Sequence, residues 1–381
     1  MRAGDARGTT GNEAGDGRNI DPSIGTLEGE ASQQQVPARR AGTQGSARFD
    51  LWTEPPSQDG DRRGDVTYYE RPVIKEPTWI WSVPAYFYTG GAAGAAALLA
   101  AAAQVLDRDG LRGLIQRSRW IAALGAAAGA GLLVHDLGRP ERFLNMLRVF
   151  RPSSPMSMGS WTLAAMAPMA ASSAVLAGAD GVLGTVGDVA GLNAGLAGMP
   201  LAGYTAVLIS NTAVPVWQAT RRTTPPLFIA SAVASAGSLL QMMKLNDSER
   251  RIVRRFAVAG ALAELASSFA LEREAGTVER VARPLHEGAG GALLKAAKAL
   301  TGTSLLLTVL PGASRLQRLA AGVLGTAGAI AVKFGIFEAG KASARDPRAT
   351  FHQQRAGYGA AEVTGEAAVT GPDFVQRGLR R

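Results

Sequence analysis

Long apolar runs are the feature of this sequence that most limits its fold. Between residues 79 and 340 the chain is dominated by Ala, Gly, Leu and Val, and polar residues divide this stretch into runs long enough to cross a membrane. A helix of about 20 apolar residues spans the hydrocarbon layer of a bilayer, and its backbone groups are paired inside the helix. The sequence therefore predicts an all-α integral membrane protein.

We predict about eight transmembrane helices from these runs. The runs are residues 79–106, 120–137, 156–179, 199–217, 227–243, 252–271, 291–310 and 316–338. The first run opens with several aromatic side chains, which is typical of a membrane–water interface. Basic residues flank the runs on both sides in similar numbers, so they do not fix the orientation of the chain.

The two ends of the chain differ in composition from this apolar body. Residues 1–66 have no apolar period and are rich in Gly, Arg, Asp and Gln, which predicts a disordered polar tail. We expect residues 67–78 to form an extended arm, residues 79–340 the transmembrane domain and residues 341–381 a polar C-terminal tail. The net charge is +9. Because arginines flank the apolar runs, this charge favours a lipid bilayer as the partner, and we expect no nucleic acid.

The chain contains no cysteine and three histidines. Thiolate zinc sites and iron–sulfur clusters held by its own cysteines are therefore excluded. Three histidines are also too few for several haem groups. We expect no haem and no metal in this chain.

The polar stretch between the second and third runs, residues 134–161, carries most of the candidate chemistry. A charged connection between two membrane-length helices is costly unless it is buried in protein or lines a wet cavity. His135 and Asp136 lie side by side at its start, and a histidine beside a carboxylate can take and release protons near neutral pH. Quinol oxidation and quinone reduction need such groups, because each electron pair moves with two protons. The alternative is that Asp136 and Arg139 form a structural ion pair.

The side chains that surround a quinone ring also have candidates in this sequence. Trp79, Tyr86, Met158 and Trp161 are able to supply its walls and hydrogen-bond donors. The motif SPMS (residues 154–157) predicts a helix start, with a serine cap and a proline at the first helical position. The alternative is that free N–H groups of this helix start point into a polar site.

Polar residues inside the later runs suggest a second function. Glu264 lies in the middle of the sixth run, and acids inside a membrane often mark a proton or substrate path. The alternative for Glu264 is a hydrogen bond to a Ser or Thr of a neighbouring helix. We expect Lys333 and Glu338 to reach the interface by snorkelling, and Asn211 to form a hydrogen bond between helices.

Several motifs resemble those of a known membrane family. HDLGRPERF (residues 135–143) followed by SPMSMGSW (residues 154–161) resembles the motif pair between the second and third helices of the NrfD/polysulfide-reductase membrane-subunit family. YFYTGG (residues 86–91), AGYTAVLISNTAVPVW (residues 202–217) and KFGIFEAGKASARDP (residues 333–347) are similar to the same family. The resemblance covers about residues 67–355 and leaves the long polar head outside it.

The resemblance implies an architecture, a ligand and partners. It implies that the helices form two four-helix bundles and that the protein binds a quinol or menaquinone without a haem or cluster of its own. Electrons would pass to or from a ferredoxin-like iron–sulfur subunit and then a molybdopterin-type catalytic subunit. The quinol site is expected in the first bundle, near the iron–sulfur partner. The residues carried over are His135 and Asp136 as catalytic, with Lys75, Tyr86, Arg139 and Trp161 as quinone-binding.

Three functional interpretations stay open. The first is a quinol-binding anchor subunit in the cell membrane, which belongs to an oxidoreductase complex but is not the catalytic subunit for its final substrate. The second is a proton-translocating or transporter-like module that uses Glu264 together with Lys295 and Lys298. The third is a purely structural anchor without quinone chemistry.

Overall fold

The computed structural model describes residues 20–21, 26–27, 72–137, 140–311 and 314–350. The first four of these residues form two short antiparallel strands, β1 (Ile20–Asp21) and β2 (Thr26–Leu27), in a unit of their own. The rest of the predicted N-terminal tail, residue Arg139 and most of the predicted C-terminal tail lie outside the described residues.

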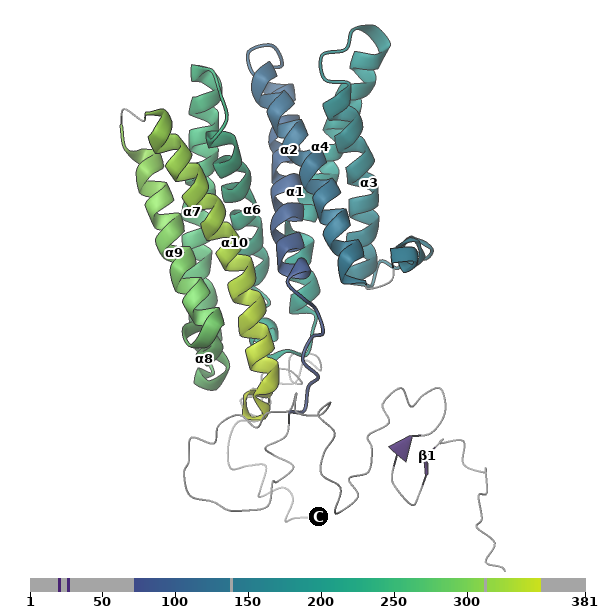
Figure 1. Ribbon diagram of the computed structural model, residues 1–381, viewed down its shortest axis with the longest axis vertical. Coiled ribbons are helices and arrows are strands. Elements are labelled where there is room, and N and C mark those ends of the chain that lie inside the picture. The colour runs from purple at the N-terminus through teal and green to yellow at the C-terminus, as the bar shows by residue number, and fades with distance from the viewer. Residues whose placement is uncertain (1–19, 22–25, 28–71, 138–139, 312–313, 351–381) are drawn as a thin grey trace, which may run out of the picture. The chain divides into compact units, whose positions relative to one another are not determined.

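From residue 72 onward, the described part of the chain is helical apart from connections, which confirms the predicted all-α class (Figure 1). Its elements are α1 (Ser82–Leu106), α2 (Arg112–Asp136), the 3₁₀ helix η2 (Pro140–Leu147), α3 (Pro155–Val175), α4 (Gly181–Ser210), α5 (Pro215–Ala219), α6 (Thr224–Gln241), α7 (Asp247–Ala275), α8 (Glu279–His286), α9 (Gly288–Val309) and α10 (Arg315–Arg345). Within these described ranges, α1, α4, α9 and α10 are long and apolar enough to cross a membrane.

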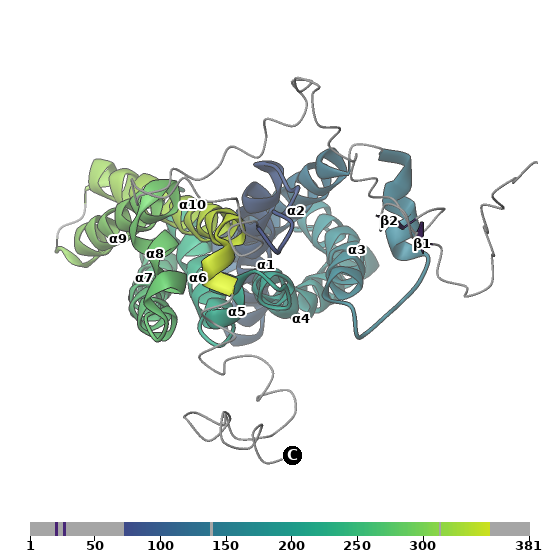
Figure 2. The ribbon, with the colours of Figure 1, turned by 90° about the horizontal axis from the view of Figure 1, so that it is seen from below.

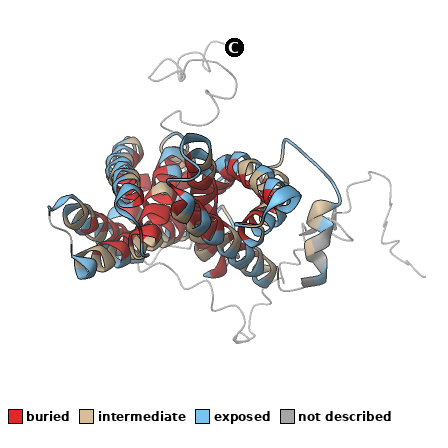
Figure 3. Cartoon of the chain, turned by 90° about the horizontal axis from the view of Figure 1, so that it is seen from above, coloured by how far each residue is buried: buried red, intermediate tan, exposed pale blue. Residues whose placement is uncertain are grey.

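The long helices pack in two groups. In the first helix group, α1 packs against α2 and α4, and α3 packs against the same two helices. In the second helix group, α6 and α9 each pack against α7 and α10. The groups lie side by side and meet where α1 and α4 contact α6 and α1 contacts α10 (Figure 2). Buried residues concentrate inside the groups and where they meet (Figure 3).

Small residues allow the helix backbones to come close together. A Cβ atom placed on Gly94 of α1 would lie 3.0 Å from the backbone nitrogen of Ala202 in α4, and closer still to the carbonyl oxygen of Gly198. In the second group, a Cβ on Gly260 of α7 would lie 2.5 Å from the backbone nitrogen of Ala234 in α6. Glycine and alanine favour such contacts in membranes, where packing rather than water exclusion drives helix association. The Ala/Gly-rich composition is therefore a packing feature.

The fourth run was predicted to end at residue 217, but α4 ends at Ser210 and α5 follows it, and the eighth was predicted to end at residue 338, but α10 ends at Arg345. Two helix starts were also predicted wrongly, and a buried ionic network explains both. The predicted fourth run began at residue 199, but α4 begins at Gly181; the second began at residue 120, but α2 begins at Arg112. The added turns contain Arg119 and Asp188, whose charges lowered the apparent hydropathy. Arg119 is 4% exposed, and its Nη2 lies 2.9 Å from Asp188 Oδ1. The same guanidinium donates to Ser173 O of α3 at 3.2 Å.

Two polar side chains also differ from their predicted positions. Lys333 does not snorkel, because it is 1% exposed and its Nζ lies 3.6 Å from the ring centroid of Phe228. The ammonium group donates to the Phe228 carbonyl at 3.3 Å, so the protein interior supplies the partners that water would. Asn211 is exposed and donates to Val207 O of its own helix at 2.8 Å, rather than to another helix.

Replacing Gly94 with alanine tests the close packing of α1 and α4. We expect Gly94→Ala to lower the free energy of unfolding by about 1–3 kcal/mol, the usual cost of overpacking, because the new methyl group meets backbone atoms of α4. Gly131→Ala of α2 is the matched control, since a Cβ there meets no atom within 4 Å. Thermal unfolding of the detergent-solubilised variants measures the difference. Equal melting temperatures for the two variants would contradict this packing.

Candidate functional site

Asp136 ties the end of α2 to the start of α1. Its Oδ1 accepts a hydrogen bond from the buried Ser82 hydroxyl at 3.2 Å and one from the Ile80 N–H at 3.4 Å. The first N–H groups of a helix have no partner within the helix, and a nearby carboxylate interacts favourably with them. Asp136 therefore holds the start of α1 from a neighbouring helix. Its predicted ion pair with Arg139 falls outside the described residues.

His135, the neighbour of Asp136, lies on the surface beside an aromatic ring. The ring centroids of His135 and Trp81 are 5.6 Å apart, and the rings are inclined at 49°. His135 is exposed, and Trp81 is 58% exposed. A planar molecule can therefore reach the imidazole from outside the first helix group. The structure brings His135 and Asp136 together with Ser82 and with Trp81, which the sequence had placed only among the interfacial aromatic residues of the first run.

Tyr86 lies deeper in the first helix group, where it pairs with a second tyrosine. The hydroxyl groups of Tyr86 in α1 and Tyr204 in α4 are hydrogen-bonded, and their ring centroids are 6.2 Å apart. Gly129 of α2 lies against the Tyr86 ring, with an ideal Cβ only 3.1 Å from Cδ2, and Gly159 of α3 lies against the Tyr204 ring. All four helices of the group thus contribute to this tyrosine pair. Tyr204 stands in the motif AGYTAV, but the sequence assigned it no role.

The SPMS motif shapes the start of α3. Ser154 accepts from the Ser157 N–H at 3.4 Å, which confirms the predicted serine cap. The Ser157 hydroxyl also accepts from the Arg151 N–H at 3.1 Å and donates to the Val149 carbonyl at 3.2 Å. These bonds fix the preceding loop against the helix. The SPMS motif therefore has a structural role, which is to cap α3 and hold the preceding loop.

Trp161 lies on the outside of α3. It is 37% exposed, and the Phe150 ring meets it edge to face with a centroid distance of 5.7 Å. Among the described residues, Trp161 thus contacts Phe150, while Tyr86 contacts Tyr204. Among the predicted quinone-binding residues that the structure describes, Tyr86 and Trp161 thus have different aromatic partners.

The extended segment before α1 is anchored to the far end of the chain. Lys75 in this segment is exposed. The next residue, Glu76, accepts two hydrogen bonds of 2.7 Å from Arg345 and forms an ion pair of 3.4 Å with Lys341, both on α10. Burial alone raises the pKa of the Glu76 carboxyl, but the bonds and charges of Arg345 and Lys341 together outweigh it, so the pKa lies below its ordinary value.

A second polar cluster is buried in the second helix group. Glu264 of α7 is 1% exposed, and its Oε1 accepts from the Thr301 hydroxyl of α9 at 2.7 Å. The charge of Lys333 in α10 acts on the same carboxylate. The Ser231 hydroxyl of α6 also acts on it, but no full hydrogen bond forms between them. The expected hydrogen bond to a Ser or Thr of a neighbouring helix is thus confirmed. The proton path through Glu264 stays a prediction.

The transporter interpretation placed the α9 lysines Lys295 and Lys298 beside Glu264, but the structure shows no contact of either with Glu264 among the described residues. Lys298 forms an ion pair with Glu272, and Lys295 is exposed. Among the described residues, the lysine whose charge acts on Glu264 is Lys333, from a different helix. The sequence missed this proximity because the two residues are far apart in the chain. The predicted eighth run also ended at residue 338, which put Lys333 near a helix end where snorkelling is common, whereas α10 continues to Arg345.

Candidate ligand positions follow from these contacts. The exposed His135 and Trp81 rings, with the Asp136 carboxylate behind them, offer a proton acceptor and an aromatic face. Within residues 72–137, 140–311 and 314–350, no group of three or more His, Asp or Glu side chains is arranged to hold a metal ion.

In the described part of the chain, four helices of membrane length and apolar composition, one of which buries Lys333 between its neighbours, define the class as a helical membrane protein. The family model for polysulphide reductase, NrfD, matches residues 73–273, which is more than half of the chain. The chain therefore belongs to the NrfD family, whose members are membrane subunits of oxidoreductase complexes. The matched region runs from the segment before α1 into α7, so it contains both Asp136 and Glu264. Comparison with curated proteins gave no match.

Replacing Glu76 with glutamine tests the anchoring of the segment before α1. Because the pKa of Glu76 is lowered on folding, its ion pair stabilises the protein fully above the ordinary carboxyl pKa of 4.5, and this stabilisation is lost as the pH falls through the lowered value. We expect Glu76→Gln to cost at most about 1 kcal/mol at pH 7, as is usual for a partly exposed pair.

The melting temperature of Glu76→Gln should also change less between pH 7 and pH 4 than that of the unaltered protein. Asp109→Asn, at an exposed position between α1 and α2, serves as the control. If the two variants show the same pH dependence of melting, the ion pair does not stabilise the fold.

Proposed function

We propose that this chain is the quinol- or quinone-binding membrane anchor subunit of a multi-subunit oxidoreductase. It exchanges electrons between the menaquinone or quinone pool and an iron–sulfur partner subunit. The observation that carries the proposal is an exposed histidine next to a carboxylate that Ser82 and Ile80 hold, at the end of a long helix and beside an exposed tryptophan. Membership of the NrfD family supports it.

Proton transfer is the part of this reaction that the chain's own residues perform. Oxidation of a quinol to a quinone releases two electrons and two protons, and reduction takes up the same number. The His135 imidazole, exposed at the interface, is placed to exchange one proton with a ring hydroxyl and with water. The Asp136 carboxylate is held by Ser82 and Ile80, so it takes or gives the second proton without moving. The Trp81 ring offers a face for the quinone ring.

The proposal includes the remaining predicted quinone-binding residues. Lys75 and Arg139 would supply cationic hydrogen-bond donors for a quinone oxygen, and Trp161 a second aromatic wall. Tyr86 would act from within the group, through the hydrogen bond that it shares with Tyr204.

An iron–sulfur partner is required because this chain has no cysteine to hold a cluster. The partner we propose is a ferredoxin-like subunit, followed by a molybdopterin-type catalytic subunit. Exposed apolar side chains gather near the starts of α1 and α3 and would support its docking. They include Ile80, Trp81, Val149, Phe150 and Met156.

We also propose that all eight long helices cross the plasma membrane, as two four-helix bundles. The helices α2 and α7 carry charged residues and are not among the helices apolar enough to span a membrane by composition alone. These charges include Arg119 and Glu264, which are both buried against neighbouring helices rather than turned toward lipid. Buried and paired charges of this kind are compatible with a membrane span.

Substitutions at His135 and Asp136 test the proposed site. We expect His135→Ala and Asp136→Asn each to lower quinol-linked electron transfer in the purified complex by roughly 100-fold, a typical loss for an acid–base group. Asp136→Asn keeps the oxygen that Ser82 and Ile80 bind, so the complex should assemble normally. Stopped-flow bleaching of the partner's clusters by menaquinol measures the rate.

Glu141→Gln is the control for these variants, since Glu141 is exposed on η2 and takes no part in the proposed site. Unchanged menaquinol oxidation in the His135/Asp136 double variant would remove this site from consideration. Binding of a quinone analogue separates the proposal from a purely structural anchor, which would bind none.

The buried Glu264 cluster favours a second candidate function, which is proton translocation. A carboxyl group that faces Thr301, Ser231 and Lys333 from three other helices is placed to hold and pass on a proton inside the membrane. We expect Glu264→Gln to stop proton movement in reconstituted vesicles while quinol oxidation continues. Glu272→Gln, on the same helix but paired with Lys298, is the control. Proton movement at the normal rate in Glu264→Gln would exclude this path.

A further inference from the structure

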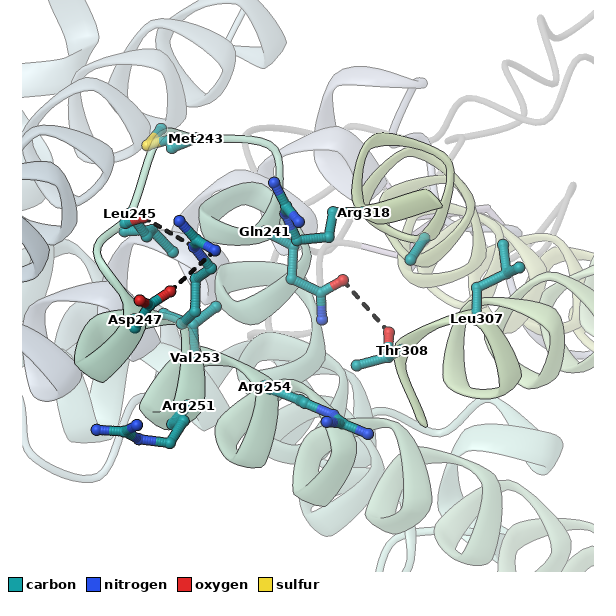
Figure 4. Close-up of a pocket in the computed structure, with 12 residues that line it drawn as sticks. Gln241, Met243, Leu245, Asp247, Arg251, Val253, Arg254, Leu307, Thr308 and Arg318 are labelled. Carbon is teal, nitrogen blue, oxygen red and sulfur yellow. Dashed lines mark hydrogen bonds and ion pairs between the residues drawn. The ribbon is translucent and has the colours of Figure 1, made fainter. Parts of the chain in front are cut away.

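A cleft opens at the end of the second helix group that lies opposite the Asp136 site (Figures 1 and 4). It has a volume of about 360 Å³ and lies between the connection of α6 to α7, the end of α9 and the start of α10. Gln241 of α6 and Thr308 of α9 line it, and the Thr308 hydroxyl donates to Gln241 Oε1 at 3.3 Å (Figure 4). In a protein that spans the membrane, the ends of its long helices meet water, so water reaches these two polar side chains.

A row of buried hydroxyl groups continues from Gln241 and Thr308 into the second helix group. Its members are Ser231, Ser235 and Ser238 of α6 and Thr301 and Ser304 of α9. Each of them is at most 5% exposed. Within each helix they follow one another, and lead up to Gln241 or Thr308, at spacings of three and four residues. Such spacings place side chains on one face of a helix.

Two glycines of α10 show that the hydroxyl groups of α6 and α9 lie close to each other. An ideal Cβ on Gly325 would lie 2.8 Å from Ser304 Oγ of α9 and closer still to Ser238 Oγ of α6. About one turn further along α10, an ideal Cβ on Gly328 would lie 2.5 Å from Thr301 Oγ1. The hydroxyl row therefore runs along the glycine face of α10.

The inner end of the hydroxyl row is Glu264. The Thr301 hydroxyl donates to Glu264 Oε1 at 2.7 Å. Glu264 Oε2 and the Ser231 hydroxyl are buried and have no hydrogen-bond partner among the described residues. Buried polar atoms without a protein partner usually bind water. Along α9, Thr301 lies only about 10 Å from Thr308, because an α-helix rises 1.5 Å per residue.

We propose that the hydroxyl row, together with buried water, carries protons between Glu264 and the aqueous phase at the cleft. A hydroxyl group both donates and accepts hydrogen bonds. Each hydroxyl therefore releases the proton that it holds as it accepts another, so it ends with the charge it had. The inference rests on the proposed translocation of protons through Glu264, and it adds the route and the end of the helices from which Glu264 is reached.

Proton movement driven by quinol oxidation tests this route in the complex reconstituted into vesicles that contain a pH-sensitive dye. Ser238→Ala/Ser304→Ala removes two hydroxyl groups from the middle of the row. We expect the rate of proton movement to fall by roughly 100-fold, a typical contribution of a positioned proton-transfer group, while quinol oxidation continues. Thr303→Ala is the control, because its exposed hydroxyl lies on α9 outside the row and bonds only to the Ala299 carbonyl of its own helix.

A second variant blocks the row without removing a hydroxyl group. Gly325→Ala places a methyl group against the Ser238 and Ser304 hydroxyls, so proton movement should slow in this variant as well. Gly302→Ala of α9 is its matched control, since a Cβ there meets no atom within 4 Å. Thermal unfolding shows whether each variant is folded.

The Glu264→Gln variant in the same assay separates this route from the proposed function. If Glu264→Gln stops proton movement but Ser238→Ala/Ser304→Ala leaves it at the normal rate, the route is wrong and the role of Glu264 stands. Gly325→Ala decides in the same way if the double variant does not fold. Normal proton movement in Glu264→Gln would exclude translocation through this residue, and the route with it.

Discussion

Pairing of polar groups inside the helix groups is the constraint on which the rest of this structure depends. Lipid offers no hydrogen bonds, so each polar side chain on a membrane helix must find its partner in the protein. Arg119 is paired with Asp188, Glu264 with Thr301, and Asp136 with Ser82. The first two of these pairs join helices that are not joined to each other by a short loop, whereas Asp136 and Ser82 join the far ends of the consecutive helices α1 and α2. The polar residues thus specify which helices become neighbours, while glycine and alanine let those neighbours come close.

The same constraint connects the two helix groups. Glu249 near the start of α7 accepts from the Leu114 N–H of α2 at 2.6 Å, and it is 2% exposed. At the opposite end of the helices, Glu76 joins the start of the chain's helical part to α10. Trp79 of the same segment stacks on Trp217 at 6.1 Å. Contacts at both ends thus hold the two helix groups together.

Much of the fold could be predicted from the sequence, because the length and composition of an apolar run indicate a membrane helix. The boundaries of α1, α3, α6 and α9 lie within a few residues of the predicted runs. The starts of α2 and α4 were missed because Arg119 and Asp188 lower the hydropathy of the sequence there. Only the folded structure shows that the two residues form a buried ion pair. For the same reason the sequence could not pair Lys333 with Glu264, or Tyr86 with Tyr204. Sequence motifs located the end of α2. The hydrogen-bond partners of Asp136 and Tyr86, which lie 54 and 118 residues away in the chain, could be identified only from the structure.

Photolabelling with an azidoquinone, followed by peptide mapping of the intact complex, tests the central claim most directly. If the quinone binds at the end of α2, the label will appear on the peptides that contain Trp81 and His135, and excess menaquinone will suppress it. Label found only on other helices, such as α9, would contradict the proposed site.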